Sequence, residues 1–279
     1  MDPHELPSSV TDQLAPASRR LVVNRRGSTV WKIESDRGPY AVKLGYAIKA
    51  TDQWDGQPWT AMAPAREAVI MHQLTPERIF HGHWEEGTWN AQPWRPGQSL
   101  WELWEPHRSA DELPQPTLDE AYSCAVTLAA LHAKGWAHGD VQPAHFIIGP
   151  TGTFLIDLAL AHSEGQVPEA CDFPYRGCLV HYEAPEISRS VLETRTATPT
   201  PEADVYGLGA SLLISATGLR HVDYPDDASR KEQRTAIVER SHRPVTVPGT
   251  LGKLIDAMLS RKPEDRPTAA EVSQVLQAP

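Results

Sequence analysis

The spacing of apolar residues along the chain changes near Gly97. Before this point, short runs rich in β-branched and aromatic residues alternate with turn residues, a pattern typical of strands. The predicted elements are a hairpin over residues 20–35, a strand over 39–47, a helix after Pro64 and a second hairpin over 78–94. After Gly97, apolar residues recur at helical spacing, as in the run over 117–135. The sequence therefore predicts an α+β fold, in which a small sheet carrying one helix is followed by a larger helical part.

Composition narrows the class of partner. The chain has 26 Lys and Arg against 36 Asp and Glu, a net charge of −10. Nucleic acids and anionic membranes attract basic surfaces, so we expect neither as a partner. No apolar run approaches the roughly 18 residues that span a bilayer, and the N-terminus lacks the residue order of a signal peptide. Three cysteines are too few for a disulfide framework, and together these features predict a cytoplasmic protein.

Four charged residues have the chemistry that phosphoryl transfer needs. Lys43 lies in an alternating strand, where a buried lysine requires a carboxylate partner, and Glu67 in the next helix can supply one. Asp140 follows a helix and a glycine, and Asp157 ends the apolar run FLID. In such a site a lysine neutralises phosphate charge, one aspartate holds a metal ion and another orients the attacking hydroxyl.

The order of seven motifs is similar to that of a known family. The motifs are YAVKL, AREAVIMHQL, AHGDVQPAHFII, FLIDLALA, YEAPEI, EADVYGLGASLL and SRKPEDRPTAAEV. In turn they resemble the lysine strand, the glutamate helix, the catalytic loop, the DFG strand, the APE element, the helix after it and the closing arginine element of the protein-kinase-like superfamily. The resemblance implies a two-lobed protein-kinase-like fold, with a flexible tail over residues 1–18, an N-lobe over 19–94 and a C-lobe over 95–279.

The resemblance also implies roles for these charged residues. Asp140 would orient or deprotonate the substrate hydroxyl, and Asp157 would hold the metal ion. Lys43, paired with Glu67, would contact the phosphates of ATP. His138 would brace the catalytic loop.

Further positions of the chain match elements of the family pattern. Asp204 would anchor the catalytic loop, and Glu186 would form a buried pair with Arg266. This pair separates protein kinases from small-molecule kinases, which commonly share the HGD sequence. The residues expected at the nucleotide are Gly27, Ser28 and Thr29 at the phosphates, with Lys43, and Gln92, Pro93 and Arg95 at the adenine.

The catalytic loop departs from the family pattern at several positions. His145 replaces the metal-binding asparagine, so it either contacts the metal or phosphate, with Mn²⁺ in place of Mg²⁺, or has a packing role. Gln142 replaces the loop lysine, and Cys178 replaces the threonine that normally partners it. Gly139 replaces the arginine that reads a phosphorylated activation loop, which disfavours switching by phosphorylation.

We therefore expect an ATP-dependent phosphotransferase that acts on Ser/Thr hydroxyls of a peptide or protein with Mg²⁺ or Mn²⁺. A pseudokinase scaffold is the alternative, and a small-molecule kinase is a third reading. By analogy, the chain is similar to stand-alone kinases of lanthipeptide-type biosynthesis, in which a separate lyase eliminates the phosphate. The cluster of tryptophans between Trp54 and Trp101 then either packs in the core or forms a docking surface for a peptide or that lyase.

Overall fold

The computed structural model describes residues 5–25, 27–50, 56–109 and 116–277. The chain forms two compact units. The first comprises the described residues up to Trp94 together with Glu164–Phe173, and the second comprises Arg95–Ser163 and the described residues from Pro174 onward. None of the described helices is long and apolar enough to cross a membrane.

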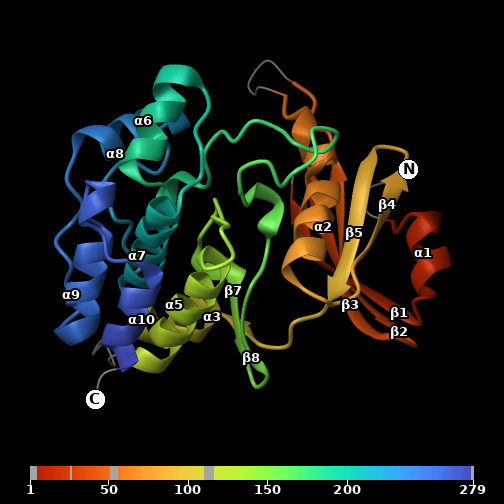
Figure 1. Cartoon of the computed structure of the whole chain (residues 1–279), viewed down its shortest axis with the longest axis horizontal. Coiled ribbons are helices and arrows are strands. Elements are labelled where there is room, and N and C mark those ends of the chain that lie inside the picture. The colour runs from red at the N-terminus through yellow and green to blue at the C-terminus, as the bar shows by residue number, and fades with distance from the viewer. Residues whose placement is uncertain (1–4, 26, 51–55, 110–115, 278–279) are drawn as a thin grey trace. The chain divides into compact units, whose positions relative to one another are not determined.

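The first unit is built on a five-stranded antiparallel sheet, shown in Figure 1. Its strands are β1 (Ser18–Arg25), β2 (Ser28–Ser35), β3 (Gly38–Tyr46), β4 (Phe80–Trp84) and β5 (Gly87–Pro93), in the spatial order β1-β2-β3-β5-β4. Helix α2 (Ala63–Leu74) lies against this sheet, with Pro64 in its first turn. Both predicted hairpins are present, because Arg25 pairs with Ser28 and Trp84 pairs with Gly87 across their turns.

A short helix, α1 (Ser8–Leu14), precedes the sheet. Its residues Val10 and Leu14 are buried and join the apolar core of the first unit. The indole Nε1 of Trp89 also donates to the Ser9 hydroxyl at 2.9 Å. The prediction of a flexible tail is therefore wrong for residues 8–14. Val10 and Leu14 lie one helical turn apart, so both face the core, and their burial there orders the helix. Residues 1–4 lie outside the described residues.

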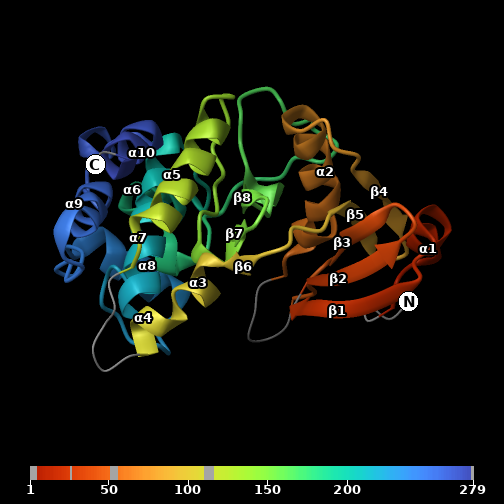
Figure 2. The same ribbon diagram turned by 90° about the horizontal axis from the view of Figure 1, so that it is seen from below.

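The second unit is mostly helical and is seen most clearly in Figure 2. Its helix α7 (Pro201–Thr217) is buried along most of its length and lies at the centre of a large apolar core. The other helices are α3 (Leu100–Leu103), α4 (Glu105–Ser109), α5 (Leu118–His132), α6 (Pro185–Thr194), α8 (Arg230–Glu239), α9 (Gly249–Met258) and α10 (Ala269–Gln277). The α+β prediction, with a sheet followed by a larger helical part, is confirmed.

A small sheet in the second unit positions the predicted catalytic residues. Its strands are β6 (Gln98–Ser99), β7 (Phe146–Gly149) and β8 (Gly152–Leu155). The loop that contains Asp140 connects α5 to β7, and Asp157 follows β8 two residues after its end. Because β7 and β8 form a tight antiparallel hairpin, the residues just before β7 and just after β8 are neighbours. The first unit also has one short 3₁₀ helix, η1 (Pro58–Ala61), and the second unit has η2 (Pro143–His145), η3 (Leu158–Leu160), η4 (Val180–Tyr182) and η5 (Pro263–Asp265).

Candidate active site

In the first unit, Lys43 on β3 and Glu67 on α2 form a buried ion pair. The Nζ of Lys43 lies 2.8 Å from the Oε2 of Glu67, and the glutamate side chain is fully buried. A buried carboxylate is costly unless it is paired and hydrogen-bonded, so this contact fixes the position of the lysine on the sheet. The predicted pairing of these two residues is present.

Two amides of β5 complete the surroundings of this carboxylate. Asn90 Nδ2 donates to Glu67 Oε2 at 3.0 Å, and Gln92 Nε2 lies 3.4 Å from Glu67 Oε1. Asn90 also donates to the carbonyl of Pro64 at 2.9 Å. Asn90 was not predicted from the sequence, although the alternation of Thr88, Asn90 and Gln92 along one strand places all three on the same side of the sheet.

The turn between β1 and β2 differs from a phosphate-binding cradle. Gly27 has a positive φ of 84°, and a Cβ at this position would meet the side chain of Ile48 at 2.9 Å. The Gly27 carbonyl accepts a hydrogen bond from the Tyr46 amide at 3.1 Å, and the Thr29 side chain is fully buried. Gly27 and Thr29 are therefore packed inside the first unit, and Ser28 alone of the three expected residues is half-buried.

The remaining residues expected at the nucleotide lie at and just after the end of β5. Pro93 is the last residue of β5 and pairs with Tyr40 of β3. The guanidinium of Arg95 lies over the ring of Phe154, 4.3 Å from its centre. The backbone contacts of Pro93 and Arg95 with adenine stay a prediction, whereas the amide of Gln92 is directed at Glu67.

In the second unit, Asp204 anchors the backbone of the catalytic loop. Its carboxylate accepts hydrogen bonds from the amides of His138 at 2.5 Å and Gly139 at 2.9 Å. The ring of His132, in the last turn of α5, lies 3.0 Å from the same carboxylate. The predicted contact between Asp204 and the loop is present, and it ties α5, the loop and α7 to one buried group.

His138 braces the loop through both nitrogens of its ring. Its Nδ1 accepts from the amide of Asp140 at 3.2 Å, so the proton is on Nε2, which donates to the carbonyl of Ile156 at 3.0 Å. Burial lowers the pKa of His138, which agrees with a neutral ring. The imidazole thus joins the residue before Asp157 to the amide of Asp140.

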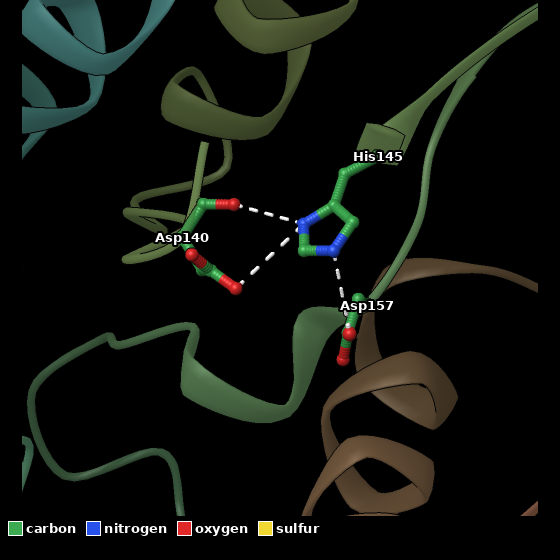
Figure 3. Close-up of side chains that lie close together, drawn as sticks. All are labelled: Asp140, His145 and Asp157. Carbon is green, nitrogen blue, oxygen red and sulfur yellow. Dashed lines mark hydrogen bonds and ion pairs between the residues drawn. The ribbon is translucent and has the colours of Figure 1, made fainter. Parts of the chain in front are cut away.

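Asp140, His145 and Asp157 lie together, as Figure 3 shows. His145 Nδ1 lies 2.9 Å from the backbone carbonyl of Asp140 and 3.8 Å from its Oδ2, and His145 Nε2 lies 3.5 Å from Asp157 Oδ2. Gln142 Nε2 donates to Asp140 Oδ2 at 3.0 Å, whereas Asp140 Oδ1 is buried with no hydrogen-bond partner among the described residues. Asp157 adopts the left-handed conformation, with φ 65°.

This group of side chains fits a divalent cation. One ligand atom from each of Asp140, His145 and Asp157 can be chosen so that all three lie within 4.8 Å of one another. Two carboxylates and an imidazole nitrogen are ligands of such ions in proteins. In the parts of the chain that the structure describes, this is the one group of this kind, and Cys171, Cys178 and His181 do not form another.

The comparisons with known proteins decide the family. Residues 43–277 match the family described as the protein kinase domain, which is well over half of the chain. The chain belongs to the protein kinase domain family. Members of this family are phosphotransferases that generally use ATP and Mg²⁺.

Curated relatives of this kinase domain include proteins from bacteria, animals and a plant. Serine/threonine-protein kinase PknK of Mycobacterium tuberculosis (H37Rv) is 29% identical over 171 residues, which cover 57% of this chain and 14% of that protein. Serine/threonine-protein kinase 16 of Homo sapiens is 30% identical over 156 residues, 50% of this chain and 48% of that protein. Serine/threonine-protein kinase PkaA of Streptomyces coelicolor is 28% identical over 156 residues, with 54% and 27% covered. The matched part spans about half or less of each relative.

Within the kinase domain, the predicted pair at the APE element is present. Arg266 donates from Nη1 and Nη2 to the two carboxylate oxygens of Glu186, at 2.7 and 2.8 Å. A second bidentate pair, which was not predicted from the sequence, joins Arg234 of α8 to the buried Glu183 at 2.7 and 2.9 Å. The amide of Cys178 donates to the same carboxylate at 3.0 Å. The pair of Glu183 with Arg234 holds the residues before α6 against α8, and the pair of Glu186 with Arg266 joins α6 to the segment between η5 and α10.

Proposed function

We propose that this kinase domain transfers the γ-phosphoryl group of ATP to Ser/Thr hydroxyls of a peptide or protein. The observation that carries the proposal is the grouping of Asp140, His145 and Asp157 at the catalytic loop, in a chain whose Lys43 and Glu67 also form an ion pair. Each relative named above is called a serine/threonine-protein kinase. These residues have the chemistry that phosphoryl transfer needs.

In the proposed reaction, Asp140 receives the proton of the substrate hydroxyl. The hydroxyl oxygen forms a bond to the γ-phosphorus, the bond from that phosphorus to the bridging oxygen breaks, and ADP leaves with the electron pair. Gln142 donates to Oδ2 of Asp140 and so fixes the orientation of the carboxylate. Lys43 would place its charge at the phosphates while Glu67 fixes its position.

Asp157 and His145 would hold the metal ion, either Mg²⁺ or Mn²⁺, whose charge offsets that of the phosphates. Pro93 and Arg95 would present a carbonyl and an amide N–H to adenine. Because Gly27 and Thr29 are packed inside the first unit, we assign phosphate binding to Lys43 and to the metal site and leave only Ser28 of the turn as a contact.

An analogy with a known group of kinases suggests which peptide accepts the phosphate. We infer that the acceptor is a precursor peptide of lanthipeptide-type biosynthesis in the cytoplasm, and that a separate lyase eliminates the phosphate. The mixed catalytic loop, with HGD and an APE element in one chain, supports this analogy. The tryptophan cluster supports it less, since Trp89 is fully buried and Trp101 alone of its described members is exposed, at 39%. Trp54 lies outside the described residues.

Phosphate transfer to a library of Ser/Thr peptides tests the proposal. With MgATP or MnATP we expect labelled product from the wild-type chain, and a loss of about 10³-fold or more for Asp140→Asn. Asp119→Asn, an exposed aspartate of α5, is the matched control and should keep full activity. If the wild-type chain binds ATP in a thermal-shift assay but transfers nothing with either metal, the pseudokinase alternative replaces the enzyme. Neighbouring genes for a short Ser/Thr/Cys-rich peptide and a lyase would support the finer proposal, and their absence would count against it.

A further inference from the structure

The structure fixes the tautomer of His145. Its Nδ1 lies 2.9 Å from the backbone carbonyl oxygen of Asp140, and a carbonyl oxygen only accepts hydrogen bonds. The Nδ1 atom therefore carries a proton, which leaves Nε2 as the ring nitrogen that can bind a metal ion. The side chain is 7% exposed, so the protein rather than the solvent sets this orientation.

The Nε2 atom is directed at a carboxylate oxygen. As Figure 3 shows, Nε2 lies 3.5 Å from Oδ2 of Asp157. Two ligands each about 2.1 Å from one metal ion are roughly 3.0 Å apart at a right angle and at most about 4.2 Å apart. The observed 3.5 Å between Nε2 and Oδ2 lies within this range, so both atoms can bind one metal ion.

We propose that His145 Nε2 is a nitrogen ligand of the catalytic metal ion, and that this ligand makes the site prefer Mn²⁺ to Mg²⁺. The inference rests on the proposed function, because the ion is the one that phosphoryl transfer requires. Mg²⁺ strongly prefers oxygen ligands, whereas first-row transition-metal ions accept imidazole. An asparagine at this position would offer an oxygen and would favour Mg²⁺. We expect the preference for Mn²⁺ over Mg²⁺ to be about tenfold higher in the wild type than in His145→Asn.

Electron paramagnetic resonance of the full chain with ADP and MnCl₂ tests the inference without measuring activity. The signal of free Mn²⁺ reports how much is bound, and competition with MgCl₂ gives the preference. Labelling the histidines with ¹⁵N separates a histidine ligand from the nitrogens of ADP in the spin-echo modulation. We expect a histidine coupling in the wild type, its loss in His145→Asn and in His145→Gln, and a lower Mn²⁺ preference in both variants.

His242→Asn is the matched control. His242 Nδ1 also lies next to a backbone carbonyl, that of Arg243 at 2.8 Å, and its Nε2 lies 3.7 Å from one carboxylate, that of Asp256. Among the described residues, no second carboxylate joins His242 and Asp256 in a group like the catalytic one, so this variant should keep both the coupling and the Mn²⁺ preference.

Three results would overturn the inference: no bound Mn²⁺ in the wild type, no histidine coupling, or a coupling that His145→Asn retains. Thermal melts without metal show whether each variant is folded. Two replacements at His145 are used so that the test still stands if one of the two variants does not fold. The outcome is separate from that of the phosphate-transfer assay. If the wild-type chain shows a histidine coupling but transfers no phosphate, this inference stands and the proposed function fails. If it transfers phosphate but shows no histidine coupling, the proposed function stands and this inference fails.

Discussion

Arg66 Nε donates to the carboxylate of Asp172 at 3.2 Å, across 106 residues of sequence. Arg66 precedes Glu67 on α2 and is buried, and its guanidinium also lies over the ring of Phe173, 5.1 Å from its centre. Burial lowers the pKa of Arg66, and the charge of Asp172 opposes this effect. The segment Glu164–Phe173 thus supplies an unmodified carboxylate to the helix that carries Glu67.

This pair predicts activity without phosphorylation of the activation segment. A phosphate that orders such a segment does so by pairing with arginine, but here Asp172 already pairs with Arg66, and Gly139 stands in place of the arginine of the catalytic loop. Treatment with a phosphatase should leave the transfer rate unchanged, whereas Asp172→Asn should lower it and destabilise the chain by about 1 kcal/mol. Asp226→Asn, which removes the exposed partner of Arg220, is the control. A phosphatase-treated chain that is inactive would contradict this prediction.

Tyr175 provides a second attachment that needs no phosphate, in the second unit. Its hydroxyl donates to the carbonyl of Gly139 at 2.7 Å, and burial raises the pKa of this phenol well above its usual value, so the hydroxyl stays a donor. In Tyr175→Phe the carbonyl loses this donor, which should cost about 1–2 kcal/mol and expose the activation segment to limited proteolysis. Tyr122→Phe, in α5, should change neither the urea midpoint nor the cleavage rate. Equal protection of the two variants would show that the hydrogen bond does not hold the segment.

Much of the fold follows from local patterns. The strands and α2 were predictable because alternation and Pro64 act locally, and the pair of Glu186 with Arg266 followed from the family motifs. The sequence patterns did not indicate helices α6 and α8. Helix α6 begins within the APE motif, just after a segment without regular periodicity, and α8 has few apolar residues. Helix α8 is held by its capping box at Ser229 and by the buried pair of Arg234 with Glu183, a contact across 51 residues that local periodicity does not reveal.

The sequence predicted which residues form the candidate site, but it did not predict the directions of their side chains. The sequence placed Asp140, His145 and Asp157 at the ends of β7 and β8, and the hairpin brings them together. It did not indicate that Gln92 would turn toward Glu67, since side-chain direction depends on the packing of α2 on the sheet. It also did not reveal that Gly27 is packed against Ile48, because those contacts come from the segment after β3.

Gly139 should tolerate no side chain. Its φ is 76°, and a Cβ would lie 2.6 Å from the carbonyl oxygen of Leu160. Gly135 has a nearly equal φ of 78°, but a Cβ there would meet no atom within 4 Å, so alanine should cost only about 1 kcal/mol for the backbone conformation. Gly139→Ala should cost about 2 kcal/mol more than Gly135→Ala in urea unfolding, because the loop must also move away from Leu160. Equal costs would show that the loop relaxes freely.

His221 should make the stability of the second unit depend on pH. The residue is fully buried, its Nδ1 donates to the carbonyl of His181 at 2.8 Å, and its Nε2 has no hydrogen-bond partner among the described residues. Burial lowers the pKa of His221 to about 3. The ordinary value in an unfolded chain is roughly 6.5. Between these values the unfolded chain binds the proton that the folded chain excludes.

The contribution of His221 is therefore fully present above about pH 6.5 and is lost as the pH falls toward the folded pKa. Between pH 7 and pH 5 the loss should be roughly 2 kcal/mol of the free energy of unfolding. His221→Gln can keep a donor to the His181 carbonyl and has no charge to gain. Urea unfolding of both proteins at pH 7 and pH 5 checks this, with a smaller fall in stability expected for the variant. His242→Gln, a more exposed histidine, should fall as the wild type does, and an identical pH dependence for all three proteins would exclude His221 as the cause.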